Sequence, residues 1–276
     1  MVRAACWPCA LLWLTAVLPF ALPANVVTAQ EFRVYTRVLQ APPGQTTVDA
    51  RTPLARSTTL FHAGKAYDYL DSSGEITIFE PAHERFLMLS PSRLQRTVVP
   101  FSEIETRLHQ ASARADQFLK EVRSGDRTEG QDLAALIETQ LRPKLTESLS
   151  ADGKLLRLES PALRYEATLA RSGDAAVVAA YARYVDWTAK LNFVLHPKSN
   201  PPAARLVLNA ALVRHQAFPM TVRLEVLQGP QAVREAIHQF EWKLGGADRK
   251  QIQQWEKLVT DKSLKSVEFE EFRRGK

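Results

Sequence analysis

Residues 74 to 91 read GEITIFEPAHERFLMLSP, and this stretch decides the fold class. Ile76 and Ile78 occupy alternate positions before a turn that contains proline, and Phe86 and Met88 alternate with leucines after it. A period of two residues is typical of β-strands, because successive side chains point to opposite faces of a sheet. The stretch therefore predicts a strand, a tight turn and a second, antiparallel strand.

The same stretch holds four groups that could bind a metal or transfer a proton: Glu75, Glu80, His83 and Glu84. A metal site needs three or four converging ligands, and no His-x-His, His-Glu-x-x-His or spaced carboxylate set lies nearby. In a hairpin Glu80 and His83 fall in the turn. We therefore expect a solvated turn in which these two residues pair locally, with no metal site and no catalytic residue.

Other short extended segments surround this hairpin, with turn residues such as Gly, Asp and Ser between them. We expect strands at 32–38, 57–62, 66–71, 75–79 and 85–89. Consecutive strands joined by tight turns form an antiparallel meander.

The period changes at Ser102, where apolar residues begin to recur every three or four positions. Ser102 and Glu105 match the Ser-x-x-Glu capping box, so a helix is expected over 102–122. Further helices are expected at 132–141, at 174–195, in a shorter segment ending near 213, and at 248–259. Further strands are expected at 154–159, 163–170, 220–226 and 236–244.

This order of elements predicts an α+β fold, in which a curved, half-barrel-like antiparallel sheet carries helices on its concave side. Residues 30–276 are expected to form a single α+β domain, and a division near residue 145 is the alternative. Several strands are apolar on both faces, so both faces must be covered by helices, by a second sheet or by a ligand. The alanine-rich helix at 174–195 suits the concave side; without it, a ligand cavity is left there.

The last hairpin supplies the candidate binding surface. Period-two counting places apolar residues on single faces of its two strands, and the aromatic ones would form a broad wall. His238 lies among them in register, which is typical of a core histidine with one ring nitrogen hydrogen-bonded. The predicted ligand-binding cavity is lined by Met220, Val222, Leu224, Phe240, Trp242 and His238.

A family resemblance supports this expectation. The run AGKAYDYL at 63–70, followed by a turn and by EITIFEP at 75–81, resembles the Gly-Lys-x-aromatic-x-aromatic hairpin of periplasmic lipoprotein carriers and outer-membrane lipoprotein half-barrels, the LolA/LolB-like family. The resemblance implies an open, strongly curved sheet that wraps around helices and holds acyl chains in an apolar interior. The helices expected at 102–141 depart from that pattern, and none of the family's functional residues can be assigned here.

The first 29 residues have the features of a secretory signal peptide. Arg3 provides a basic start, Ala10 to Leu22 form a short apolar run, and small residues precede a cleavage site after Ala29. A retained membrane anchor is the alternative, although Pro19 and Pro23 interrupt or closely follow the apolar run. We expect a periplasmic or secreted protein.

Both cysteines, Cys6 and Cys9, would leave with this segment. The remaining chain then has no thiolate nucleophile and no cysteine ligand for zinc. It carries 35 Lys and Arg, the 36 of the whole chain less Arg3, against 30 Asp and Glu. These charges do not form the dense basic clusters of a nucleic-acid-binding protein, so we expect no nucleic acid partner.

These observations predict an exported envelope protein that carries or senses an apolar ligand, an acyl chain or a lipoprotein, without a cofactor and with peripheral membrane contact. The alternative is a non-catalytic structural or interaction protein of the cell envelope. An enzyme is the third reading, because no nucleophile and base can be paired from the sequence.

Overall fold

The computed structural model describes residues 31–42, 44–49, 51–125, 131–197, 199–228 and 232–275, and the side chains of 131 and 132 are not included. The predicted signal peptide and both cysteines lie outside these residues. The described strands are β1 (Phe32–Gln40), β2 (Ala55–His62), β3 (Lys65–Leu70), β4 (Glu75–Glu80), β5 (Arg85–Ser90), β6 (Gln95–Pro100), β7 (Thr146–Leu149), β8 (Leu155–Glu159), β9 (Leu163–Arg171), β10 (Ala217–Val226), β11 (Ala232–Glu241) and β12 (Lys265–Ser266). The described α-helices are α1 (Phe101–Arg123), α2 (Gln131–Leu141), α3 (Ala175–Leu195), α4 (Ala203–Arg214), α5 (Gly246–Thr260) and α6 (Phe269–Arg274).

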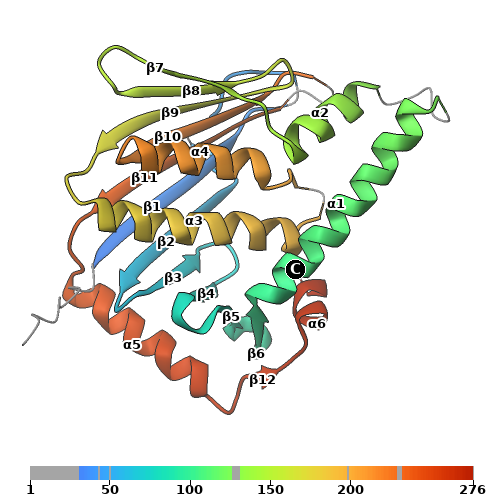
Figure 1. Cartoon of the computed structure of the whole chain (residues 1–276). Helices are drawn as coiled ribbons and strands as arrows, with labels where there is room; N and C mark the ends of the chain where they lie inside the picture. Colours follow the sequence, from blue (N-terminus) through green and yellow to red (C-terminus); the bar gives the residue numbers. More distant parts are fainter. Residues whose placement is uncertain are drawn as a thin grey trace, which may run out of the picture.

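All these strands belong to one curved sheet, in the order β12-β6-β5-β4-β3-β2-β1-β11-β10-β9-β8-β7. Neighbours are antiparallel except for the short parallel pairing of β12 with β6. Figure 1 shows the sheet curling around α3 and α4. The predicted fold class, an α+β chain with a curved antiparallel sheet, is therefore confirmed.

The first strand joins the two halves of the chain. β1 pairs with β2 on one side and with β11 on the other, where Val34 lies opposite Phe240. Helices α1 and α2 follow β6 near one edge of the sheet and lead to β7 at the other edge. These helices therefore leave the sheet continuous. That residues 30–276 fold as one cooperative unit stays a prediction.

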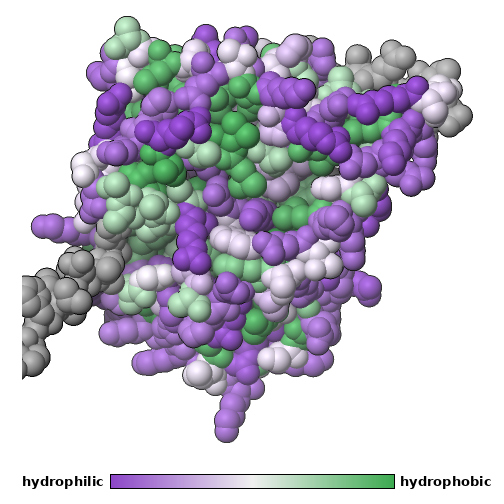
Figure 2. All heavy atoms as spheres, viewed as in Figure 1, coloured by the Kyte–Doolittle hydropathy of each residue, from purple (hydrophilic) through white to green (hydrophobic). Residues whose placement is uncertain are grey.

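The concave face of the sheet is packed against α3. Its side chains Tyr181, Tyr184 and Leu191 are buried in one cluster with Phe61 and Phe79 of the sheet. Helix α4 covers the neighbouring part of the same face, over β8 to β10. In Figure 2, which has the viewpoint of Figure 1, apolar side chains are visible among polar ones over these two helices. The helix expected at 174–195 thus fills much of the concave side.

The convex face is covered by α5. Trp255 and Ile252 of this helix pack against Tyr67, Ile78 and Leu87, whose side chains point away from α3. The expectation of helices on the concave side therefore holds for α3 and α4, whereas α5 lies on the opposite face. This arrangement explains why several strands are apolar on both faces.

The turn between β4 and β5 is less solvated than the sequence suggests. Glu80 is only 4% exposed. It forms ion pairs with Lys65 (2.8 Å) and Arg85 (2.8 Å), while His83 lies farther away at 3.6 Å. The expected local pair is therefore present, but Glu80 belongs mainly to a buried ion-pair network at the strand ends.

Helix α1 begins one residue earlier than predicted. Its N-cap position is held by Pro100, and no side-chain cap hydrogen bond is present. The predicted capping box at Ser102 is therefore wrong. The backbone carbonyl of Ser102 instead accepts a hydrogen bond from the hydroxyl of Thr106, one helical turn later (2.8 Å). In the described part of the chain, no helix is long and apolar enough to cross a bilayer.

Candidate functional site

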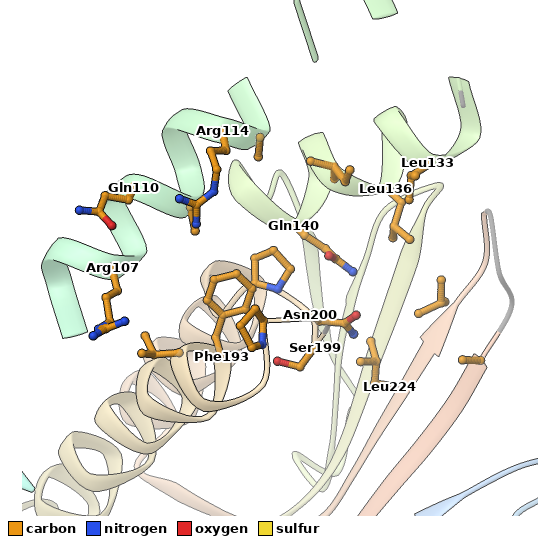
Figure 3. A pocket seen from close by; sticks show the side chains of 18 of the residues that line it. Arg107, Gln110, Arg114, Leu133, Leu136, Gln140, Phe193, Ser199, Asn200 and Leu224 are labelled. Atoms are coloured by element: carbon orange, nitrogen blue, oxygen red, sulfur yellow. The ribbon is translucent and has the colours of Figure 1, made fainter. Parts of the chain in front are cut away.

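A cavity of about 800 Å³ lies where α1, α2, the segment between α3 and α4, and the ends of β10 and β11 meet. Figure 3 shows side chains from each helix and from β10 around it. This volume falls within the range of about 300–1,000 Å³ that is typical of small-molecule sites. The cavity is therefore the candidate functional site.

One face of α1 forms a wall of the cavity. Arg107, Gln110, Ala111, Arg114 and Ala115 follow the spacing i, i+3, i+4, i+7 and i+8, which places them on a single side of a helix. The two alanines have short side chains, so they leave space between α1 and the elements opposite. Arg107, Gln110 and Arg114 lie on the same side of the helix, and their longer side chains extend farther from its axis.

The opposite walls are apolar. Leu133, Leu136 and Ile137 come from α2, Phe193 from α3, and Leu224 from β10. Leu136 is buried in a small cluster with Ala162 and Val226, which ties α2 to the end of β10. A ligand in this cavity would therefore meet hydrocarbon on most of its surface.

Gln140 is the most enclosed polar group of the lining. Its residue is 5% exposed, and Figure 3 shows its amide directed into the cavity from α2. Among the described residues, its side chain has no hydrogen-bond partner. Ser199 is a second case, because its Oγ is buried and also lacks a partner within the described chain.

A smaller cavity of about 150 Å³ lies next to the first. Ala111, Ala115, Phe193 and Pro201 line both, so these residues form the partition. The second cavity extends between α1 and the start of α4.

Of the six residues predicted to line a cavity, Leu224 lines the large one. Val222, two positions earlier on the same face of β10, is buried beneath α4 with Leu208 and Leu212. Met220 lies in a β-bulge between Pro219 and Thr221 and is half-buried. The bulge shifts the register, so period-two counting does not carry from Val222 back to Met220.

Phe240 and Trp242 form an aromatic wall at the other end of the hairpin. Their rings stack with centroids 5.3 Å apart, and Trp242 is 52% exposed. Phe240 also contacts Tyr181 of α3, so the helix covers this part of the wall. The structure therefore separates this pair from the cavity that contains Leu224, and ligand binding by Phe240 and Trp242 stays a prediction.

His238 is a buried residue between these two regions. Its Nδ1 lies 2.9 Å from Oγ1 of Thr36 on β1, and its Nε2 has no partner among the described residues. Burial lowers the pKa of His238 to about 3, and the positive charge of Arg205 acts in the same direction. The imidazole is therefore neutral at physiological pH, with one ring nitrogen bonded as expected.

No group of three or more His, Cys, Asp or Glu within the described ranges could hold a metal ion. The six lining residues predicted from the sequence all belong to the last hairpin, whereas most of the residues that line the cavity come from α1, α2 and the segment that joins α3 to α4. The sequence indicates the cavity only weakly. Ala111 and Ala115 stand at inward positions of α1 where larger apolar residues would fill the space. Prolines at 197, 201 and 202 keep the segment between α3 and α4 from being helical.

No protein-family model matches this chain, and no curated protein matches it. Among solved structures, the chain is similar to a LolA superfamily protein from Nitrosomonas europaea. The similarity has 10% sequence identity, covers 80% of this chain and 89% of the other, and has a TM-score of 0.30. At this TM-score the likeness carries no conclusion about function, which must come from the cavity.

Proposed function

We propose that the protein is an exported, non-enzymatic carrier or sensor that binds an acyl-type apolar ligand in the cavity between α1, α2 and the β10–β11 hairpin. The observation that carries this proposal is a cavity of about 800 Å³, open to solvent on one side, with apolar side chains from three separate elements. Leu224, one of the residues predicted from the sequence, lies in it.

The energetics are consistent with an acyl chain. Each methylene group moved from water into an apolar cavity contributes about 0.8 kcal/mol. Roughly ten methylenes would contribute about 8 kcal/mol, and association costs on the order of 4–15 kcal/mol. The gain from hydrocarbon contacts thus falls inside the range of the association cost, so a tightly bound ligand needs polar contacts as well.

Phe240, Trp242 and Met220 are proposed as a second apolar surface of the same hairpin. Because Tyr181 packs on Phe240, this surface would accept a ligand only if α3 moves away from β11. Exposed Leu133 at the large cavity adds an apolar contact through which the protein would touch a membrane peripherally while loading or releasing its ligand.

The test is direct detection of a ligand. The mature protein is purified without detergent, extracted and examined by mass spectrometry for bound lipid, and a fluorescent fatty acid is then titrated into the delipidated protein. We expect a stoichiometric lipid or saturable binding. A clean apo mass together with no saturable binding contradicts the proposal.

A cavity-filling pair localises the site. Ala115→Phe places a ring in the cavity and should weaken fatty acid binding at least about tenfold. Ala113→Phe is the matched control, because Ala113 is exposed on the same helix and does not line the cavity. Equal binding by both variants and the wild type would place the ligand elsewhere, with the Phe240–Trp242 surface as the next candidate.

A non-catalytic structural or interaction protein of the cell envelope is the second candidate. It is favoured by the packing of α3 onto the concave face, which leaves little of that face open to a ligand. The two candidates differ in the lipid experiment, because an interaction protein would contain no stoichiometric lipid and show no saturable fatty acid binding.

A further inference from the structure

The charge of the large cavity is one-sided. Four arginines line it, namely Arg107, Arg114, Arg234 and Arg273, and none of its described lining residues is Asp or Glu. A cavity with apolar walls and cations at its margin suits a molecule with a hydrocarbon part and a negative group.

Two of the four arginines already have carboxylate partners. Arg107 forms ion pairs with Glu103 (2.7 Å) and with Glu270, and Arg273 pairs with the same Glu270 (2.7 Å). These contacts join α1 to α6. Arg107 and Arg273 therefore have a structural role that reduces their availability to a ligand.

The other two arginines have no carboxylate partner among the described residues. Arg234 donates only to the side-chain oxygen of Gln40 (3.2 Å). Arg114 makes no hydrogen bond or ion pair within the described chain, and Figure 3 shows its side chain extending from α1 toward the cavity. Arg114 is therefore the arginine of the lining that has no partner among the described residues, and it is available to bind an anion.

Gln140 provides a second, independent observation. The Gln140 residue is only 5% exposed, and its amide is directed into the cavity and has no hydrogen-bond partner among the described residues. A ligand that accepts a hydrogen bond from its NH₂ group would supply the partner that the described residues do not.

We infer that the cavity binds an anionic amphiphile, whose negative oxygens are held by Arg114 and Gln140 and whose hydrocarbon part lies against Leu136 and Leu224. The inference rests on the proposed function and specifies the chemical class of its ligand. A fatty acid carboxylate and a lipid phosphate share the required chemistry, a negative group with two or more acceptor oxygens beside an alkyl chain.

The experiment compares amphiphiles that share one chain length. Dodecanoate, dodecyl phosphate and dodecanol are titrated against the mature full-length protein as competitors of the fluorescent fatty acid, at low and at moderate salt. We expect both anions, or one of them, to bind at least about tenfold more tightly than dodecanol, with the difference shrinking at higher salt. The preferred anion identifies the source of the negative group.

Two variants and one control assign the residues. Arg114→Gln should remove most of the preference for anions and leave dodecanol binding unchanged. Gln140→Leu should also weaken anion binding, because the amide that would donate to the anion is removed. Arg56→Gln, at an exposed arginine of β2 that does not line the cavity, removes the same charge and should have no effect.

Each outcome has a defined meaning. Equal affinity of the wild type for dodecanol and for the anions overturns the inference and leaves the carrier proposal standing. A loss of binding for all three amphiphiles in Arg114→Gln overturns the assignment of Arg114 as the anion-binding group. No binding of any amphiphile to the wild type overturns both the inference and the proposed function.

Discussion

The ring of Tyr181 on α3 lies edge to face on the ring of Phe240 on β11, with centroids 5.5 Å apart and an interplanar angle of 66°. The same tyrosine ring contacts Phe218 of β10 at 5.5 Å. Helix α3 therefore closes the aromatic part of the concave face, and the space left for a ligand lies farther along the hairpin, beside Leu224. This contact decides which part of the predicted surface is accessible.

The packing of Tyr181 predicts a large loss of stability in Tyr181→Ala. Removing a buried aromatic ring typically costs about 3–5 kcal/mol in the free energy of unfolding. Tyr181→Phe is the control, and its free energy of unfolding should stay within about 1 kcal/mol of the wild-type value. The ring contacts persist in this variant, and the hydroxyl has no hydrogen-bond partner among the described residues. Urea unfolding measures both. A Tyr181→Ala protein as stable as the wild type would show that α3 is only loosely held on the sheet.

The convex face gives a second stability prediction. Trp255 of α5 is 5% exposed and stacks on Tyr69 at 5.9 Å and on Tyr67 at 6.3 Å. Trp255→Ala should lower the free energy of unfolding by about 3–5 kcal/mol. Trp242→Ala, at a half-exposed tryptophan, should cost clearly less in the same urea titration. If Trp255→Ala costs less than about 1 kcal/mol, α5 is not an integral layer of the fold.

His238 predicts how stability depends on pH. Its pKa is lowered by burial from 6.5 to about 3 in the folded state. Below pH 6.5 the unfolded chain therefore takes up a proton that the folded chain excludes until the pH approaches 3. The contribution of the neutral imidazole to the free energy of unfolding is complete above pH 6.5. It is lost as the pH falls toward 3, and the loss is about 2 kcal/mol at pH 5.

The variant His238→Gln isolates this effect. The difference in free energy of unfolding between wild type and His238→Gln, measured in urea at several pH values, should move in favour of the variant as the pH falls from 7 to 5. His109→Gln, at an exposed histidine of α1, should keep the wild-type profile. Parallel curves for wild type and His238→Gln would contradict the buried neutral state.

Arg93 predicts how α6 is held. Its guanidinium donates to Glu75 (2.7 Å) and to the backbone carbonyl of Phe272 (2.8 Å), and it lies 4.5 Å from the centre of the Phe272 ring. Arg93→Met should destabilise the protein by about 1.5–3 kcal/mol, because the charge-assisted hydrogen bond between Arg93 and the buried carboxylate of Glu75 is lost. Hydrogen exchange should quicken first in α6. Adding Glu75→Gln to the variant should recover part of the loss; if it does not, the ion pair is not the cause.

Export is the last prediction, and it comes from the sequence. Protein recovered from its native host should begin at or near Gln30 and lie in the periplasm or outside the cell, because the first 29 residues match a cleavable signal peptide. N-terminal sequencing of each cell fraction measures this directly. An intact Met1 in the soluble cytosolic fraction would end the proposal of an exported carrier.

Local periodicity was sufficient to predict the longer elements. Strands β2 to β5 and helices α1, α3 and α5 lie within a few residues of their predicted ranges, because a period of two or of 3.6 is imposed by backbone geometry and is visible in a short window. β7, β12 and α6 were missed because each is too short to show a period. β6 was missed for a different reason: Val98 and Val99 are adjacent, so its alternation is interrupted.

The composition of both strand faces also indicated correctly that the sheet is covered twice. It could not tell what covers each face, because that depends on contacts between residues far apart in the chain. The pairing of β1 with β11 joins positions about 200 residues apart, and it alone makes Thr36 the partner of His238. No local pattern specifies such a pairing.

The cavity is the clearest case of a feature that only the tertiary structure decided. The inward position of Ala111 and Ala115 was predictable from helical spacing, but a small residue on a buried face normally allows close packing. Here Leu136 of α2 and Leu224 of β10 approach from different directions and do not fill the space beside the two alanines. Whether a short side chain leaves a void depends on how closely its neighbours from other elements approach it. The sequence alone does not specify the separation between those elements.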